Sequence, residues 1–338
     1  FLVPEAIQTS AMDCGPASLK SLLEGFGVSA SYGRLREACQ TGVDGTSIDT
    51  MEEAAVQLGL DAVQVMLPLD HLLDRAADAL PGIVVVRQPN GSTHFVVAWR
   101  RHGPLVQVMD PGVGRRWMGI GRFLEDVYEH RMPIDAAAWR EWAGSDSFMD
   151  VLRARLKRLG AADARLIADA LADSGAAKLA RLDAAVRMTQ RLADSGAVRR
   201  GGESARMVDV LARGAMPIPA EYWSARPIDE QPDQVMLRGA VVLQVKGRKE
   251  RADAKLSPEL AAALTEKPAR PALELLRILA GDGVLPLLMI AGALALSAFG
   301  SVVEALLLRG LYDLARELTS TGQRAAAIGA ALGFLAAL

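Results

Sequence analysis

An apolar stretch without a single charged side chain, from Gly283 to Val303, limits the possible folds of this chain more than any other feature. An α-helix of about 20 apolar residues crosses a hydrocarbon core of about 30 Å, so this stretch predicts a transmembrane helix. The alternative is a helix buried in a large soluble core, although such helices seldom stay uncharged over this length. A second apolar run, Ala325 to Leu338, predicts another span that is cut short where the sequence stops.

Charged residues on the two sides of the first run indicate its orientation. Glu304 and Arg309 follow the run, and a series of basic residues precedes it: Lys246, Arg248, Lys249, Arg251, Lys255, Lys267, Arg270 and Arg277. Because the cytoplasmic flanks of membrane spans are enriched in Lys and Arg, the N-terminal side is expected in the cytoplasm. The sequence therefore predicts a protein that contacts membrane lipid and carries a cytoplasmic N-terminal part.

The segment from Gln8 to Leu19 places Cys14 in the first turn of a predicted helix. Asp13 is a favourable N-cap residue, and Pro16 is tolerated in a first helical turn. The free N–H groups and the positive end of the helix dipole favour a thiolate at this position. A lone cysteine is more often a small core residue, so Cys14 needs partners before it counts as a nucleophile.

Alternating and β-branched runs downstream predict an antiparallel meander of three strands: Gly82 to Arg87, His94 to Arg100 and Leu105 to Met109. The second of its turns covers Arg101 to Pro104. If that turn is centred near His102, His94 lies directly opposite Asp110, with Cβ atoms about 4.5–5.5 Å apart. An imidazole at the start of one strand then meets a carboxylate at the end of the next.

Together these residues suit nucleophilic catalysis by a thiol. Cys14 is the predicted nucleophile, His94 the general base and acid, and Asp110 the group that orients the ring. Gln8 is the candidate donor to the oxyanion, beside the backbone N–H of Cys14. Taken singly, Gln8 suits an exposed surface, Asp110 a turn and His94 a strand end, but their combination favours catalysis.

These residues resemble the papain-like cysteine peptidase domains at the N-terminus of peptidase-containing ABC exporters of the bacteriocin type. The resemblance covers roughly residues 1 to 130. It lies in Gln8 followed by Asp13-Cys14-Gly15, in Gly45-Thr46-Ser47, in His94-Phe95-Val96-Val97 and in Asp110-Pro111. Many members carry a second cysteine four positions after the nucleophile, where this chain has Ser18. The resemblance implies Cys14, His94 and Asp110 as the catalytic triad and Gln8 as the oxyanion donor.

The resemblance also implies a function. Such domains cut leader peptides after a double glycine, and the exporter then transports the mature peptide at the expense of ATP. We therefore expect a thiol endopeptidase in the bacterial inner membrane, acting on a precursor peptide and forming a homodimer through its transmembrane domain. No G-x-x-x-x-G-K-[ST] phosphate loop occurs in the sequence, so the ATPase domain and its ATP and Mg²⁺ are expected beyond Leu338.

The predicted fold class is α+β. A papain-like peptidase domain, 1–135, is followed by a mostly helical cytosolic connector with short strands, 136–280, and by the start of a transmembrane helical domain, 281–338. Within the first domain, Tyr32 to Ala38 and Thr46 to Leu58 are predicted helices and Leu60 to Leu67 a strand. In the connector, Val235 to Val245 predicts one or two short strands.

Composition excludes several other functions. The formal net charge is −2, and no basic stripe is interleaved with aromatic residues, so nucleic acid is not an expected partner. Four scattered histidines and two cysteines form no metal-ligand cluster, and neither a metal nor a cofactor is expected for the peptidase domain. A disulfide between Cys14 and Cys39 would remove the thiolate, so Cys39 is expected to be a buried helix residue.

Two other functions stay open on the sequence alone. The first domain could dock a secretion substrate without cutting it, as degenerate relatives do. It could also use the same thiol for acyl transfer. The intact Cys14, His94 and Asp110 argue against docking alone, whereas nothing in the sequence excludes transfer.

Overall fold

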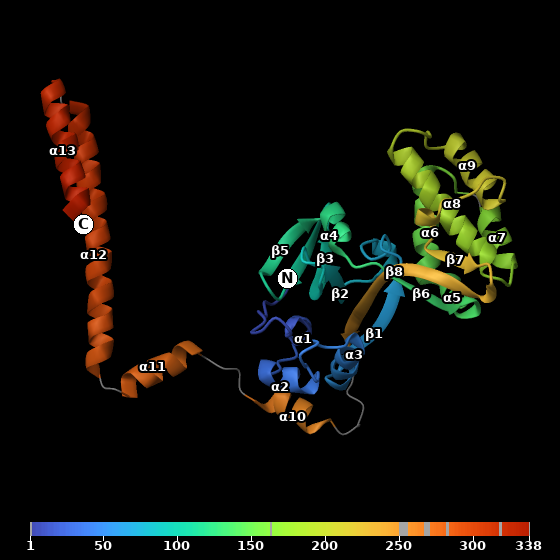
Figure 1. The fold of residues 1–338 in the computed structure, drawn as a ribbon, viewed down its shortest axis with the longest axis horizontal. Coiled ribbons are helices and arrows are strands. Elements are labelled where there is room, and N and C mark those ends of the chain that lie inside the picture. Colours follow the sequence, from blue (N-terminus) through green and yellow to red (C-terminus); the bar gives the residue numbers. More distant parts are fainter. Residues whose placement is uncertain are drawn as a thin grey trace. The chain divides into compact units, whose positions relative to one another are not determined.

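The computed structural model describes residues 2–162, 164–249, 256–266, 271–281, 284–317 and 320–337. The chain divides into two units, Phe1–Lys267 and Pro268–Leu338 (Figure 1). The first unit contains an antiparallel sheet with two groups of helices, and the second consists of helices.

Three helices follow the N-terminal segment: α1 (Cys14–Gly25), α2 (Tyr32–Ala38) and α3 (Ile48–Gln57). The predicted helices in these regions are confirmed. Ser47 caps α3 because its hydroxyl accepts a hydrogen bond from the Thr50 N–H. The apolar side chains of α1 are fully buried at Leu19, Leu22 and Leu23, and they form part of one core with α3 and the sheet.

The main sheet has the strand order β1-β8-β2-β3-β4-β5, and its neighbouring strands are antiparallel. Its strands are β1 (Leu60–Leu67), β2 (Gly82–Arg87), β3 (Thr93–His102), β4 (Leu105–Asp110), β5 (Gly114–Gly119) and β8 (Gln231–Arg248). The strands predicted before Asp110 are thus confirmed. A 3-10 turn, η1 (Arg75–Ala77), interrupts the β1–β2 connection, and α4 (Ile120–Asp126) follows β5.

Both faces of the sheet are covered. On one face, Ile83, Val97 and Leu243 pack in the core formed with α1 and α3. On the other face, Val84 and Val96 pack with Phe123 of α4 and with the β1–β2 connection. Because β2 is buried on both sides, its sequence is a continuous β-branched run and does not alternate.

Strand β8 departs most from the expected arrangement. The segment predicted as one or two short strands is a single strand of 18 residues. Its C-terminal half lies between β1 and β2, and its N-terminal half pairs with β6 (His130–Asp135) and β7 (Ala225–Ile228). Figure 1 shows β8 reaching from the side of α1–α3 to the second group of helices.

The helix α10 (Pro258–Thr265) returns to the N-terminal helices after β8. Leu260 and Ala263 are buried in the core that contains α1 and α3, and the Ser31 N–H donates to the Ala263 carbonyl at 2.7 Å. Strand β8 and α10 both fall within the expected connector, 136–280, yet they share a sheet and a core with the expected peptidase domain, 1–135. The division at positions 135 and 280 stays a prediction.

A second group of helices has a core of its own. It comprises α5 (Ala136–Ala143), α6 (Asp146–Leu159), α7 (Ala164–Ala172), α8 (Ala177–Asp194) and α9 (Gly202–Ala212). The buried centre includes Trp139, Phe148 and Leu179, and the aromatic rings of Trp139 and Phe148 meet edge to face. A short turn, η2 (Ala220–Tyr222), leads from this group to β7.

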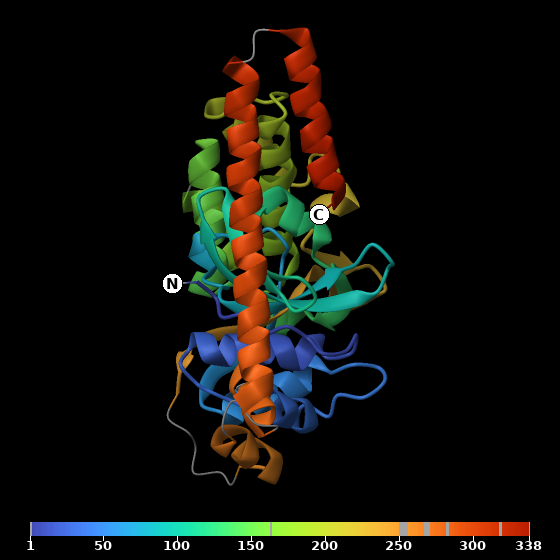
Figure 2. The same ribbon diagram turned by 90° about the vertical axis from the view of Figure 1, so that its left-hand side faces the viewer.

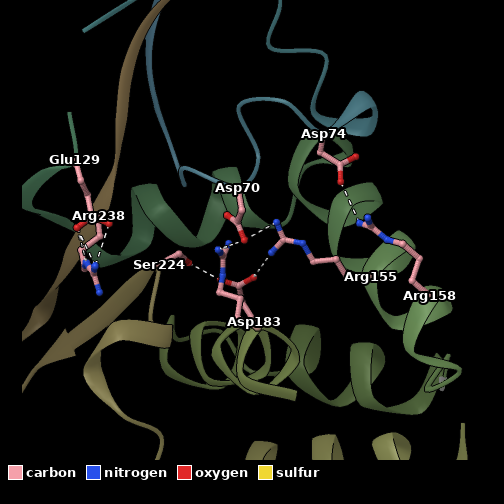
Figure 3. A network of polar contacts seen from close by, with 9 residues as sticks. Asp70, Asp74, Glu129, Arg155, Arg158, Asp183, Ser224 and Arg238 are labelled. Atoms are coloured by element: carbon pink, nitrogen blue, oxygen red, sulfur yellow. Dashed lines mark hydrogen bonds and ion pairs between the residues drawn. The ribbon is translucent and has the colours of Figure 1, made fainter. Parts of the chain in front are cut away.

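An ion-pair network joins this helical group to the sheet (Figure 3). Asp70, in the loop after β1, binds Arg155 of α6 at 2.7 Å and also binds Arg187 of α8. Arg187 binds Asp183 at 2.8 Å, and Asp183 accepts a hydrogen bond from Ser224. Only 3% of the Arg155 side chain is exposed, so its charge depends on these carboxylates for solvation.

The second unit contains α11 (Pro271–Gly281), α12 (Val284–Glu317) and α13 (Thr321–Ala337). Helices α12 and α13 lie side by side (Figure 1 and Figure 2). Among the described residues, one segment is long and apolar enough to cross a membrane: Leu288–Gly310, with 23 residues and a mean hydropathy of 1.9. It includes most of the predicted span and continues past Glu304.

The second predicted span corresponds to α13, which is shorter, at 17 residues. Several residues used for the membrane prediction lie outside the described residues: Arg251, Lys255, Lys267, Arg270, Gly283 and Leu338.

Candidate active site

Cys14 is the first residue of α1, at the end where the backbone N–H groups are free. Burial acts to raise the pKa of its thiol, but hydrogen bonds from the His94 side chain and from the backbone of Phe95 and Gly15 outweigh it. The pKa of Cys14 is therefore lower than that of an ordinary thiol, which favours the thiolate at neutral pH.

His94 and Asp110 are hydrogen-bonded, with 2.8 Å between Nε2 and Oδ1. Because Nε2 is engaged by the carboxylate, Nδ1 is the ring nitrogen that remains for Cys14. Burial acts to lower the pKa of His94, but the hydrogen bonds with Asp110 and Cys14 raise it to about 9. The structure thus brings together the thiol of Cys14, the imidazole of His94 and the carboxylate of Asp110, the three groups predicted from the sequence.

The predicted strand register is wrong, although the predicted contact is present. Val97 lies opposite Met109, and the same register continued places Asp110 opposite Val96, two positions beyond His94. The turn is the short loop Gly103-Pro104, which shifts the register away from the predicted one, and a bulge after Ala98 moves it back by one position. The two side chains still share one face of the sheet and meet diagonally.

Gln8 lies beside the segment that follows Asp110, since its backbone N–H donates to the Pro111 carbonyl at 3.0 Å. Its side-chain oxygen is buried and has no hydrogen-bond partner among the described residues. The N-terminal segment therefore places Gln8 next to the residue that follows Asp110. Its role as oxyanion donor stays a prediction.

Asp13 occupies the N-cap position of α1, but its side chain does not cap the helix. Its buried carboxylate instead accepts a hydrogen bond from Thr9 at 2.9 Å and forms an ion pair with Arg36 of α2 at 2.8 Å. Burial acts to raise the pKa of Asp13, yet the hydroxyls of Thr9 and Ser10 and the charge of Arg36 lower it. The carboxylate is ionised and anchors the turn that precedes Cys14.

The loop that carries Gly45-Thr46-Ser47 lies against Gly15, the residue after Cys14. A Cβ atom at Gly15 would lie 2.9 Å from Cβ of Thr46 and 3.1 Å from the sulfur of Met51. Contacts this close require glycine at position 15, because both neighbours are packed side chains. The motif that supported the family resemblance therefore has a packing function beside Cys14.

Cys39 is buried, as expected, with 1% of its surface exposed, but it lies directly after α2 and not within the helix. Burial raises the pKa of its thiol to about 12. The pKa of Cys39 is thus raised, whereas that of Cys14 is lowered, so Cys14 ionises at the lower pH of the two.

The sequence pattern of the Peptidase C39 family matches residues 3–128, the segment that holds Cys14, His94 and Asp110. Residues 3–128 belong to this family. Peptidase C39 is a family of cysteine peptidases, and the C39 domain of this chain is accordingly a thiol endopeptidase domain of mixed α and β structure.

A curated relative carries the same kind of domain. The Lactococcin-G-processing and transport ATP-binding protein LagD of Lactococcus lactis subsp. lactis is 26% identical over 138 residues, which cover 38% of this chain and 20% of LagD. This chain thus spans about a fifth of the length of that relative.

Two solved structures resemble the C39 domain. A double glycine motif protease from an AMS/PCAT transporter, solved with its leader peptide, is 24% identical, with 37% of this chain and 85% of the other covered and a TM-score of 0.33. The peptidase domain of Streptococcus ComA, a bi-functional ABC transporter, is 28% identical, with 37% and 92% covered and a TM-score of 0.35.

Arg116 is a charged residue of the C39 site that the sequence alone did not indicate. Arg116 of β5 donates to Oδ2 of Asp110 at 3.0 Å, while the Gly112 N–H donates to Oδ1 at 2.9 Å. Burial acts to raise the pKa of Asp110, but the hydrogen bonds with His94 and with the Gly112 N–H, and the charges of His94 and Arg116, lower it. The hairpin spacing is the signal that could have predicted Arg116, since a tight turn follows Asp110.

Proposed function

We propose that this chain is the peptidase-bearing part of a bacterial peptide exporter and that Cys14 cleaves a precursor peptide after a double-glycine leader. The observation that carries the proposal is the contact of Cys14 with His94 and of His94 with Asp110 within the C39 domain. The name of the relative LagD, a lactococcin-G-processing and transport protein, supports a precursor peptide as the substrate.

The proposed reaction has two halves. The thiolate of Cys14 attacks the carbonyl carbon of the last leader residue, and the negative charge moves to the carbonyl oxygen. The backbone N–H of Cys14 and the amide of Gln8 stabilise this oxyanion. The imidazolium of His94 gives its proton to the nitrogen of the leaving amine, the C–N bond breaks, and the leader remains as a thioester on Cys14.

Water completes the cycle. His94, now neutral, takes a proton from a water molecule, whose oxygen attacks the thioester carbon. The C–S bond breaks, the leader leaves with a new carboxylate, and the Cys14–His94 pair returns to its starting protonation. Asp110 holds the ring in one orientation throughout and stabilises the imidazolium without taking its proton.

A requirement for two glycines follows from steric selection. A groove that admits only the backbone before the scissile bond rejects any side chain by clash. The substrate is therefore a flexible, extended segment whose last two leader residues lack Cβ atoms.

We further propose that cleavage is coupled to ATP-driven export across the bacterial inner membrane. The segment Leu288–Gly310 supports a membrane location by its length and hydropathy. The proposed full transporter contains an ATPase domain that binds ATP and Mg²⁺, forms a homodimer through its membrane helices and keeps its C39 domain in the cytoplasm.

The test uses the full chain, Phe1–Leu338, in detergent micelles with a peptide whose leader ends in Gly-Gly, followed by mass spectrometry of the products. We expect the wild type to give two fragments, with the cut after the second glycine, and Cys14→Ala to give none. A matched peptide with Ala-Ala at the two positions should stay intact. An uncut peptide that still binds the wild type would indicate docking, and an acyl adduct on an added amine would indicate transfer.

A further inference from the structure

The β4–β5 hairpin places an arginine on the same side of the sheet as Asp110. Asp110 lies opposite Gly114, and Val108 lies opposite Arg116. Because side chains alternate along a strand, residues 108 and 110 share a face with residues 114 and 116. Arg116 is therefore the first long side chain of β5 that can reach back to the carboxylate.

The three donors around Asp110 divide its two oxygens. His94 Nε2 and the Gly112 N–H bind Oδ1, at 2.8 and 2.9 Å, and Arg116 binds Oδ2 at 3.0 Å. With both oxygens engaged, the carboxylate cannot rotate without losing a charge-assisted hydrogen bond. The donor on Oδ2 thus determines which oxygen faces the imidazole.

Arg116 also changes the balance of charge. A carboxylate without a cation partner would strongly stabilise the imidazolium form of His94. Transfer of the Nδ1 proton from the ring to a leaving amine would then be slower. The guanidinium, 3.0 Å from the carboxylate, offsets part of that charge. The other carboxylate near the nucleophile, Asp13, already has its own cation in Arg36.

We propose that Arg116 is a positioning residue of the peptidase, which fixes Asp110 in the orientation that His94 requires and moderates the hold of Asp110 on the imidazolium. This inference rests on the proposed peptidase function. Arg116 contacts Asp110 and acts on the reacting atoms through it.

The neighbouring Arg115 provides a matched control. It lies on the same strand, and its contacts are with the N-terminal segment: its backbone N–H donates to Glu5 at 3.1 Å and its guanidinium to the Val3 carbonyl at 2.9 Å. Arg115→Gln therefore removes one positive charge from β5 and leaves the Asp110 contacts in place. We expect it to retain wild-type activity.

The experiment compares Arg116→Gln, Arg116→Lys and Arg115→Gln in the full chain. The first readout is the rate of alkylation of Cys14 by iodoacetamide as a function of pH, which needs no peptide substrate. Cys39 is buried with a pKa of about 12 and will not contribute. The second readout is kcat on the double-glycine peptide across the same pH range.

For Arg116→Gln we expect kcat to fall about 10- to 100-fold, as for a catalytic group that is displaced slightly. The alkylation midpoint and the alkaline limb of kcat should both move to higher pH, because loss of a positive charge raises every nearby pKa. Arg116→Lys keeps the charge without the planar fork, so its pH midpoint should match the wild type while kcat falls less.

The inference would be overturned if Arg116→Gln kept the wild-type kcat and the wild-type pH midpoint. It would also be overturned if Arg115→Gln lowered kcat as much as Arg116→Gln does. If Arg116→Gln does not fold, as judged by circular dichroism, the lysine variant decides: a displaced midpoint in that variant contradicts the inference. A wild type that leaves the peptide uncut but alkylates as expected would refute the proposed substrate and not the role of Arg116.

Discussion

Ile83 of β2 lies directly opposite Leu243 of β8, and both side chains are fully buried. The partner strand for the C39 sheet thus comes from far beyond the matched segment, 3–128. Within the described residues, β1 pairs only with β8, so the sheet contains β1 only if β8 is present.

A chain that ends at residue 135 should therefore fold poorly. It loses β8, which leaves β1 without a partner and opens the edge of β2 at Ile83 and Val84. We expect cooperative urea unfolding for a chain that ends at residue 266, and aggregation or a broad transition for the shorter chain. Equal unfolding midpoints for the two chains would show that β8 does not stabilise the domain.

The close approach of β8 to β1 predicts a steric effect at Gly239. A Cβ atom there would lie 2.2 Å from the carbonyl oxygen of Leu67, which is backbone and cannot move away. We expect Gly239→Ala to lower the free energy of unfolding by about 1–3 kcal/mol or more, as measured by urea denaturation. Gly247→Ala is the control, because a Cβ on that residue of the same strand meets nothing within 4 Å. Similar losses for both variants would contradict the predicted clash.

Removal of Asp70 should destabilise the junction between the sheet and the second group of helices. Among the described residues, Arg155 and Arg187 would then share Asp183 as their one carboxylate partner, and just 3% of the Arg155 side chain is exposed. We expect Asp70→Ala to cost about 2–3 kcal/mol, less than for a fully buried pair because Asp70 is partly exposed.

The control for this prediction is Asp150→Ala. Asp150 pairs with Arg153 on the surface, and both side chains are more than half exposed. Its loss should change stability by no more than about 0.5 kcal/mol. If Asp70→Ala unfolds at the same urea concentration as Asp150→Ala, the network does not hold the junction together.

The pH dependence of activity follows from the shifted pKa values of Cys14 and His94. The pKa of Cys14 is lowered from 9.0, and that of His94 is raised to about 9. The reactive thiolate–imidazolium pair therefore forms as pH rises through the Cys14 pKa and is lost as pH rises through about 9, where His94 gives up its proton. We expect kcat on the double-glycine peptide to decline above about pH 9. A kcat that keeps rising well beyond that pH would rule out the imidazolium as the acid.

Gln8→Ala tests the predicted oxyanion donor. Loss of one such donor lowers kcat by about 10²–10³-fold in other hydrolases, and KM should change little because the donor acts on the developing charge. Circular dichroism should show an unchanged fold. A variant with wild-type kcat would remove Gln8 from the reaction and leave the backbone N–H of Cys14 as the donor.

Local sequence patterns were sufficient to predict α1 to α3 and β1 to β4, and they selected the three residues that we propose as the triad. Helix caps, apolar periodicity and β-branched runs act over a few residues, so they can be recognised without a fold. The residues Cys14, His94 and Asp110 were found in the same way, from a helix start, a strand start and a strand end.

The tertiary structure decided what depends on contacts between distant segments. The bulge after Ala98 changed the register that brings His94 to Asp110, and Arg116 joined the site only through the β4–β5 pairing. Strand β8 entered the sheet between β1 and β2 because burial of Leu243 and Val245 there completes a core that segment 1–135 leaves open. No local pattern encodes such a partner, since a strand is stabilised by its neighbours and not by its own sequence alone.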